Sequence, residues 1–553
     1  MTTFQQNVMA DESELTIDLT ASELDGCPDF LLSAAKSAAV ERGKPAGSYV
    51  ITLSRSLVEP FLTFSPRRDL REKAWRLWTN RGQLNPARDN LELAKETLLL
   101  RCEQARLHGY ESFAAYQNAD SMAKTPQAVN ELLERVWEPA CLSAATEAAS
   151  LEACLRSELS DPSAELEPWD WRYCAEKVRL QRYDFDETAL KPYLSLEGMQ
   201  AALFDTAERL FGLRFVKVDL AAREITLYHP DVELYEVRRA GTTGGEQEDE
   251  LVALFLHDNY ARPNKQSGAW MSEFREQTRN WNTYEFEAAS TTGSSVPIRS
   301  AGPSCTPQLP IVINNNNFAR SEPCLLSFDD ALTLFHEMGH GLHGMLSSVG
   351  YRRLSGTSVL RDFVELPSQL LEHWLSSTDA VLARHAAHWA TGEPVPPPML
   401  RALHAARNFN QGFETVEYTV CALLDQALHA LPEPELGSLR VDEFEAETLR
   451  RLKMPKAIVM RHRPAHFLHL FADSGYAAAY YVYLWAEVLD ADAFDSFLES
   501  GDVFDAPTAS RLAKWIYSTG NSVEPSEAYR RFKGRDPTVE PMLKKKGLLP
   551  AAA

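Results

Sequence analysis

The sequence predicts a mainly α-helical protein of two lobes, with a small β-sheet beside a deep cleft. Three observations support this fold class. The chain has 553 residues, which is more than one small core usually holds, so at least two packed lobes are expected. Helical periodicity dominates up to about residue 159 and again towards the C-terminus. Between these parts, from about Leu213 to Asp258, β-branched residues alternate or run together and are split by Gly and Pro, a pattern typical of strands and hairpins.

The first part of the chain is expected to be helical from about Ser33 to Leu159. Apolar residues recur three and four positions apart from Leu70 to Trp78, and again from Leu91 to Leu107. Within the strand region that follows, the segment from about Gly241 to Glu250 is rich in glycine and charge, which predicts an exposed turn.

Composition excludes several classes of function. The chain carries 78 acidic and 56 basic residues, a formal net charge of -22, so its average surface repels phosphate backbones and anionic membranes. We therefore expect neither a nucleic acid nor a membrane as a partner. No stretch of about 18 apolar residues is present, and the eight cysteines are scattered singly, as in proteins of a reducing compartment. These features predict a cytoplasmic protein.

An apolar strand, PIVI, runs into four consecutive asparagines, Asn314 to Asn317. Exposed amides at the edge of a sheet could bind an extended peptide backbone. The alternative is a plain polar turn after the strand.

The sharpest signal lies in a helix expected from about Phe328 to Ser348, which Ser327 can cap at its start. His336 and His340 are four residues apart, so a helix places both imidazoles on one face, where they can share one cation. Glu337 then projects towards a water molecule at that cation. Neutral imidazole nitrogens suit zinc, and a catalytic zinc site needs three protein ligands and one open position. The alternative is a helix with two buried, hydrogen-bonded histidines.

A third ligand must come from elsewhere. The zinc-peptidase pattern H-E-x-x-H-x-x-G-x-x-H is excluded, because His343 and Leu346 stand where it requires glycine and histidine. Glu365, 29 residues after His336, could complete the site if Asp362 to Trp374 is helical apart from its early proline, since carboxylate oxygen is an acceptable zinc ligand. His343 lies on nearly the same helical face as His336, and could be a fourth ligand or a residue that supports the ligands.

Several stretches together resemble one known family. HEMGH, SGTSVLRDFVELPSQ and HLFADSGYAAAYYVYLWAEVLDADAF look like the thimet oligopeptidase, neurolysin and bacterial peptidyl-dipeptidase family of zinc metallopeptidases. ARPNKQSGAWMSEFR, PIVINNNNF and ARNFNQGFETVEY resemble the bacterial peptidyl-dipeptidase branch in particular.

The resemblance implies one zinc ion per chain, held by His336, His340 and Glu365, with Glu337 as the general base. It also implies that a histidine and tyrosines of the glycine-containing stretch hold substrate and stabilise the tetrahedral intermediate. In this sequence those residues are His469, Tyr476 and Tyr483.

The fold implied by the resemblance is a zincin-like peptidase. Residues 1–108 would form a helical segment that packs with the catalytic lobe, residues 109–301 a helical lobe with the small sheet, and residues 302–553 the zinc-binding lobe. One departure concerns the tyrosine stretch, where relatives commonly have AAGYY and this chain has Ala478-Ala479-Tyr480-Tyr481, which removes backbone freedom.

The predicted activity is hydrolysis of short peptides with release of C-terminal dipeptides. An endo-acting oligopeptidase is the nearest alternative, and the sequence does not separate the two. A non-catalytic peptide-binding protein that kept the fold is an alternative of another class, but it would have no use for Glu337 beside a metal. The arginines and lysine Arg262, Lys265, Arg407 and Arg461 are candidates to receive a substrate carboxylate, and the sequence does not rank them.

Overall fold

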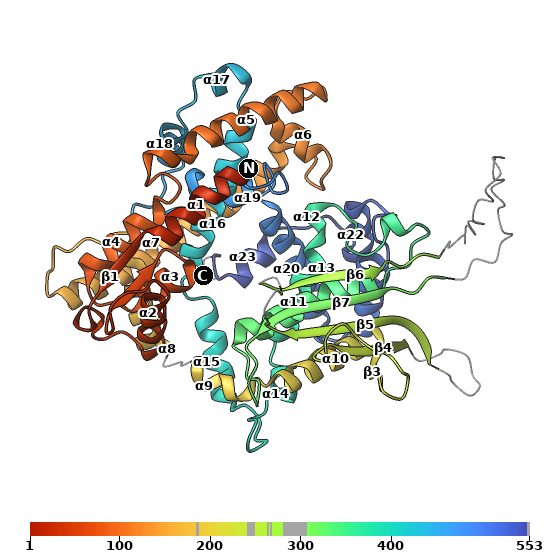
Figure 1. Ribbon diagram of the computed structural model, residues 1–553. Helices are drawn as coiled ribbons and strands as arrows, with labels where there is room; N and C mark the ends of the chain where they lie inside the picture. Colours follow the sequence, from red (N-terminus) through yellow and green to blue (C-terminus); the bar gives the residue numbers. More distant parts are fainter. Residues whose placement is uncertain (184–186, 240–248, 263–264, 266–267, 280–306, 550–553) are drawn as a thin grey trace, which may run out of the picture. The chain divides into compact units, whose positions relative to one another are not determined.

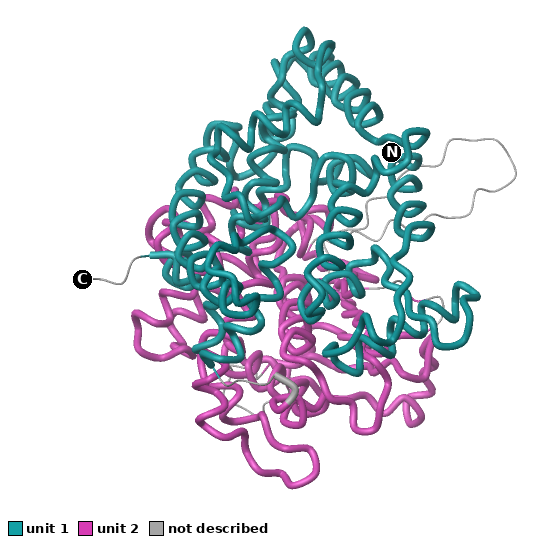
Figure 2. Tube along the Cα trace, turned by 90° about the vertical axis from the view of Figure 1, so that its left-hand side faces the viewer, with its two compact units in different colours: residues 1–185, 405–485, 542–553 teal, residues 186–404, 486–541 magenta. Residues whose placement is uncertain are grey.

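A computed structural model of the chain describes residues 1–183, 187–239, 249–262, 265, 268–279 and 307–549 (Figure 1). It divides into two compact units, each built from separate segments of the chain. Unit 1 comprises residues 1–185, 405–485 and 542–553, and unit 2 comprises residues 186–404 and 486–541 (Figure 2). The predicted turn near Gly241 lies largely outside the described residues. The predicted division at residues 108 and 301 differs from these units and stays a prediction.

Unit 1 is helical apart from one small two-stranded sheet. Its elements are α1 (Thr2–Glu14), β1 (Thr16–Leu19), η1 (Ala21–Leu24), α2 (Asp29–Glu41), β2 (Tyr49–Thr52), α3 (Arg55–Phe64), α4 (Arg68–Thr79), η2 (Pro86–Arg88), α5 (Asn90–Leu107), α6 (Phe113–Ala119), α7 (Pro126–Leu159), α8 (Trp171–Tyr183), α16 (Gln411–Ala430), α17 (Glu433–Gly437), α18 (Val441–Arg451), η5 (Pro464–His466) and α19 (Leu468–Phe471). Strands β1 and β2 pair antiparallel. These four-residue strands lie too far apart in the sequence to form a hairpin signal, and β2 interrupts a region expected to be helical.

The longest helix of unit 1, α7, packs along α16. The two backbones approach closely at Gly412, where an added Cβ would lie 2.4 Å from the amide nitrogen of Ala144. The face that α16 turns to the interior of unit 1 carries buried polar residues, among them Asp425, Gln426 and His429.

Unit 2 combines helices with a five-stranded sheet. Its elements are α9 (Glu187–Leu190), η3 (Lys191–Tyr193), α10 (Leu196–Phe211), β3 (Leu213–Lys217), β4 (Glu233–Arg239), β5 (Glu250–Tyr260), β6 (Trp270–Arg275), β7 (Ile311–Phe318), α11 (Phe328–Met345), η4 (Arg352–Leu354), α12 (Arg361–Val364), α13 (Leu366–Ser376), α14 (Leu382–His385), α21 (Ala506–Leu512), the π-helix Ala513–Tyr517 and α22 (Pro525–Lys533). Three more helices, α15 (Pro397–Arg407), α20 (Val482–Ser500) and α23 (Glu540–Lys545), cross the unit boundaries.

The sheet of unit 2 has the strand order β3-β4-β5-β7-β6. All neighbours are antiparallel except β5 and β7, which are parallel. Helix α11 packs against β5, β6 and β7 (Figure 1). The prediction of a mainly α-helical chain with a small sheet is confirmed, and the predicted strands between Leu213 and Asp258 are β3, β4 and β5.

The prediction for the four asparagines is wrong. They are neither a turn nor an exposed edge, because Asn314 to Asn317 continue strand β7, which lies between β5 and β6. Asn314 and Asn316 are fully buried. The strand tolerates these polar side chains partly because amides bind across it: Asn316 donates to Asn259 at 2.9 Å, and Asn315 donates to the carbonyl of Trp270 at 3.3 Å.

Candidate metal centre

Helix α11 carries both histidines of the predicted site. Its start is fixed by a capping box, in which the Ser327 hydroxyl accepts from the Asp330 amide and the Asp330 carboxylate accepts from the Ser327 amide, each at 3.0 Å. The helix ends at Met345 rather than at the expected Ser348. Four-residue spacing brings the His336 and His340 rings to 5.0 Å between centroids.

The third ligand candidate, Glu365, lies between two helices. It directly follows α12 and is the N-cap of α13. The expected single helix is therefore broken at this residue. Its Oε2 atom lies 3.4 Å from His336 Nε2 and 3.3 Å from His340 Nε2. The Ser368 hydroxyl donates to the same Oε2 at 3.1 Å and to the Glu365 carbonyl at 2.8 Å, which fixes the carboxylate towards the histidines.

A close contact between helices places Glu365 there. Gly339 of α11 meets the start of α13, and a Cβ at this position would lie 2.4 Å from both the Pro367 carbonyl oxygen and the Ser368 Cα atom. On the other side, the hydroxyl of the buried Tyr517 donates to the same Pro367 carbonyl at 2.9 Å. The turn that carries Glu365 is therefore held between α11 and the π-helix Ala513–Tyr517.

These three residues fit a tetrahedral metal ion. The ligand atoms of His336, His340 and Glu365 all lie within 4.8 Å of one another. Bonds of about 2.0–2.2 Å in a tetrahedron place ligand atoms about 3.3–3.6 Å apart, which agrees with the two nitrogen–oxygen distances above. Two imidazoles, one carboxylate and an open position form a donor set typical of catalytic zinc.

A carboxylate that the sequence analysis missed supports the first histidine. Glu372 Oε1 lies 2.7 Å from His336 Nδ1, so that Nδ1 carries the proton it donates and Nε2 is left to face a metal. Glu372 follows Glu365 by seven residues, two turns further along the sequence of α13, and that spacing was the available signal. Burial opposes protonation of His336, but the hydrogen bonds to Glu365 and Glu372 outweigh it and raise its pKa to about 10 in the absence of a cation.

Glu337 is poised as a proton acceptor. Its side chain is 5% exposed, and its Oε2 has no hydrogen-bond partner among the described residues. Burial raises the pKa of this carboxyl, and the neighbouring imidazoles oppose the rise. A carboxylate with a raised pKa and a free lone pair is suited to accept a proton from water near neutral pH.

His343 does not join this cluster. It is fully buried, and neither ring nitrogen has a hydrogen-bond partner among the described residues. Burial lowers its pKa to about 3. Its ring faces Phe363 and Tyr517, each at 6.3 Å between centroids, so it packs as a neutral side chain beneath the site.

The remaining predicted residues gather in unit 1. The His469 ring lies 5.6 Å from that of Tyr476, and Tyr476 stacks on Tyr483 with 5.5 Å between centroids. Burial lowers the pKa of His469, so the imidazole is neutral near pH 7. The three side chains thus form one aromatic cluster. Their action on a substrate held at the histidines of unit 2 stays a prediction.

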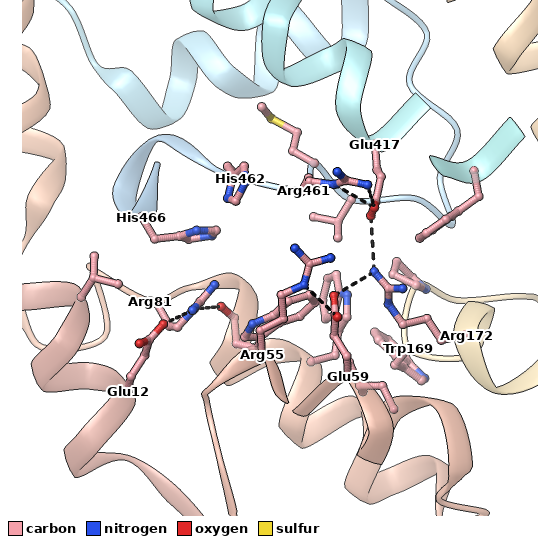
Figure 3. Close-up of a pocket in the computed structure, with 18 of the residues that line it drawn as sticks. Glu12, Arg55, Glu59, Arg81, Trp169, Arg172, Glu417, Arg461, His462 and His466 are labelled. Atoms are coloured by element: carbon pink, nitrogen blue, oxygen red, sulfur yellow. Dashed lines mark hydrogen bonds and ion pairs between the residues drawn. The ribbon is translucent and has the colours of Figure 1, made fainter. Parts of the chain in front are cut away.

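Figure 3 shows a cavity of unit 1. Its volume is about 170 Å³, and His469 is one of the residues that line it. Its lining includes both apolar side chains, such as those of Leu62, Trp75 and Trp78, and charged ones. Figure 3 shows a chain of ion pairs along one wall: Arg461 and Arg172 share Glu417 at 2.9 and 3.5 Å, and Arg172 and Arg55 share Glu59 at 3.3 and 2.9 Å.

Two of the other cations proposed for a substrate carboxylate are paired with Asp258, which balances one of their two charges. Arg262 forms a two-pronged pair with Asp258 at 2.7 Å, and Lys265 lies 2.9 Å from the same carboxylate. Among the described residues, no helix has the length and apolar character needed to cross a bilayer.

Comparison with known proteins places the chain among metal-dependent peptidases. The model of peptidase family M3 matches residues 61–548. The dipeptidyl carboxypeptidase of Escherichia coli (strain K12) is 35% identical, and the match covers 95% of this chain and 72% of the relative. Oligopeptidase A of the same organism is 34% identical, covering 95% and 73%. A probable cytosolic oligopeptidase A of Arabidopsis thaliana is 31% identical, covering 100% and 76%.

Proposed function

Because this chain belongs to peptidase family M3, we propose that its peptide hydrolysis is carried out at one zinc ion bound by His336, His340 and Glu365, with Glu337 as the general base. The observation that carries the proposal is a set of three donor atoms within 4.8 Å of one another, with the Glu365 oxygen at tetrahedral spacing from both imidazole nitrogens, beside a buried carboxylate with an unpartnered oxygen. When bound, zinc supplies Lewis-acid chemistry that activates water and polarises a peptide carbonyl.

The other steps of hydrolysis are assigned to side chains around the ion. Glu337 Oε2 accepts the proton of the attacking water and later returns it to the leaving amine. Glu372 and Ser368 hold His336 and Glu365 in the orientation that the ion requires. Hydroxyl groups of Tyr476 and Tyr483, or the imidazole of His469, are suited to donate to the oxygen on which negative charge develops.

Metal analysis of single variants tests this assignment. His336→Ala and Glu365→Ala should purify without stoichiometric zinc, because two protein ligands hold the ion only weakly. Glu337→Gln should keep both zinc and fold but lose activity. Stoichiometric zinc in His336→Ala would contradict the ligand assignment, and near-normal turnover by Glu337→Gln would contradict the role of the base.

We further propose release of C-terminal dipeptides, with endo-acting cleavage as the second candidate. The names of the relatives allow both, since one of the three is a dipeptidyl carboxypeptidase and the other two are oligopeptidases. The cavity of unit 1 favours the first. Along its wall Arg55, Arg172 and Arg461 share only Glu59 and Glu417, so this chain of five groups carries one surplus positive charge that a terminal carboxylate would balance.

Paired peptides separate the two activities. We expect a peptide with a free C-terminus to lose dipeptides and its amidated twin to be cut poorly. Arg55→Gln leaves two arginines paired with two carboxylates. It should raise KM for the peptide with a free C-terminus and leave KM for the amidated peptide unchanged. Equal cleavage of both peptides would establish the endo-acting alternative. Cytoplasmic location and the preference for short peptides over folded proteins stay predictions.

A further inference from the structure

The segment that carries Tyr476 has no regular secondary structure but is firmly held. It joins α19 to α20, and its inner backbone faces helix α16 of the same unit. The Asp425 carboxylate accepts from the Ala478 amide at 2.8 Å through Oδ1, and from the Tyr480 amide at 3.0 Å through Oδ2. Gln426 donates to the Ala478 carbonyl at 2.7 Å. Two adjacent residues of α16 therefore bind three backbone groups of this loop, Asp473–Tyr481.

The other end of the loop is bound through a buried arginine. Arg101 of α5 is 3% exposed and donates to the Asp473 carbonyl at 2.9 Å. Its other terminal nitrogen lies 3.1 Å from His429 Nε2, and His429 Nδ1 lies 2.8 Å from Asp425 Oδ1. Arg101, His429 and Asp425 thus form a continuous chain between the two ends of the loop.

The contacts of His429 determine which of its ring nitrogens carries the proton. A guanidinium only donates hydrogen bonds, so His429 Nε2 must accept one and the ring proton resides on Nδ1. That proton is donated to the Asp425 main-chain carbonyl at 3.0 Å, and Asp425 Oδ1 lies 2.8 Å from the same nitrogen. The guanidinium, the imidazole and the carboxylate thus contact one another in sequence, each side chain at most 3% exposed. Buried charges persist only when they are paired in this way, and the removal of one leaves the other unpaired.

The loop shows the effect of this restraint at Ala478. This residue has a φ of +54°, a left-handed conformation that costs an L-residue about 1–2 kcal/mol. Such strain persists only where surrounding contacts impose it, and here Asp425 and Gln426 bind both the amide and the carbonyl of Ala478. The loop is therefore set in one conformation by its neighbours rather than by its own preference.

We propose that Arg101, His429 and Asp425 are positioning residues for peptide hydrolysis, which fix the loop Asp473–Tyr481 and with it the stacked pair Tyr476 and Tyr483. This inference rests on the proposed function, because it assumes that the two tyrosines act on substrate. It extends that function to three buried residues that would act only through the loop.

The test is Asp425→Asn, which keeps the shape and removes the charge. An amide cannot accept from both backbone N–H groups, and it removes one of the two carboxylates, Asp425 and Asp473, that attract Arg101. We expect faster hydrogen exchange in the peptide that contains Asp473–Tyr481, unchanged zinc content, and a fall in kcat of about 10- to 100-fold with a much smaller change in KM, since misplacement by about 1 Å costs on that order.

Asp170→Asn is a matched control. Asp170 is fully buried in the same unit, pairs with Arg68 and Arg71, and accepts from the Glu167 amide. Its replacement should lower stability without a change in loop exchange or kcat. Gln426→Met provides a milder variant if Asp425→Asn fails to fold, and should shift exchange and kcat in the same direction by a smaller factor.

The outcomes are distinguishable from failure of the proposed function. Unchanged loop exchange in Asp425→Asn, or faster exchange with normal kcat, would overturn the positioning role. An equal fall of kcat in Asp170→Asn would overturn it as well. If the unmodified, zinc-loaded enzyme cuts no peptide, the proposed function is refuted instead. The comparison of hydrogen exchange would still decide whether Arg101, His429 and Asp425 hold the loop.

Discussion

Gly339→Ala adds one methyl group at the contact between α11 and the turn that carries Glu365. The new Cβ would lie 2.4 Å from backbone atoms of Pro367 and Ser368, about 1 Å inside the shortest ordinary contact of 3.4 Å. Backbone atoms cannot rotate away as a flexible side chain can, so α11 and α13 must separate by about that amount. Overpacking of this kind costs about 1–3 kcal/mol.

Gly339→Ala should weaken metal binding more than it lowers the stability of the fold. Metal–ligand distances tolerate about 0.2 Å, so a displacement of about 1 Å should move Glu365 out of reach of an ion at His336 and His340. We expect zinc affinity, measured by competition with a chelating dye, to fall at least about 10- to 100-fold, as for lost support of a ligand. Peptidase activity at limiting zinc should fall with it.

Gly412→Ala is the matched control, because its Cβ would meet the amide nitrogen of Ala144 at the same 2.4 Å. It lies in unit 1, whereas Gly339 lies in unit 2. The unfolding temperature should fall by about 1–2 °C per kcal/mol in either variant of a chain of this size, but only Gly339→Ala should lose zinc. Wild-type zinc affinity in Gly339→Ala would refute the argument that this contact sets the position of Glu365.

Three further predictions concern neighbouring carboxylates. Glu372→Gln should keep the fold but weaken zinc binding about 10- to 100-fold, because His336 loses the acceptor that fixes its tautomer; unaltered affinity by titration would remove Glu372 from the site. Glu337→Gln should lower kcat by about 10²–10⁴-fold with full zinc content, measured on one peptide under saturating conditions. Burial raises the pKa of Glu273 to about 7, so its ionisation destabilises the fold as pH rises from about 4.5 through 7. Glu273→Gln should therefore raise the unfolding temperature at pH 8 but not at pH 5, and an equal change at both would contradict the pKa assignment.

The local part of the metal centre was predictable from the sequence. His336, His340 and Glu337 are placed by helical spacing alone, and the capping residues of α11 mark its start. Glu365 needed more, because its position depends on the contact at Gly339, which nothing in the spacing of the histidines reveals. Glu372 was missed because its spacing from Glu365 is a weak signal and a glutamate on a helix usually faces solvent, whereas the fold brings it to His336 Nδ1.

The prediction for the asparagine strand failed because its residue types suggested the wrong environment. Polar residues ordinarily signal a turn or an edge, but Asn314 and Asn316 are buried in the interior of the sheet. Asn316 has its partner on β5, Asn259, which lies 57 residues away in the sequence. Strand β6 was also missed, because its six residues, WMSEFR, include no β-branched residue and none of them is fully buried. Pairings between distant residues carry these features, and sequence periodicity does not report them.

The hydrogen bond from Tyr517 to the Pro367 carbonyl has a consequence for biosynthesis. It joins residues 150 positions apart, and it steadies the turn that presents Glu365. A ribosome releases His336, His340 and Glu365 long before it releases Tyr517. A nascent chain therefore exposes all three donor groups while their geometry is still unsupported, and bound ions should exchange freely at that stage. The zinc retention that we propose for this site therefore requires the segment that carries Tyr517 to have docked against Pro367.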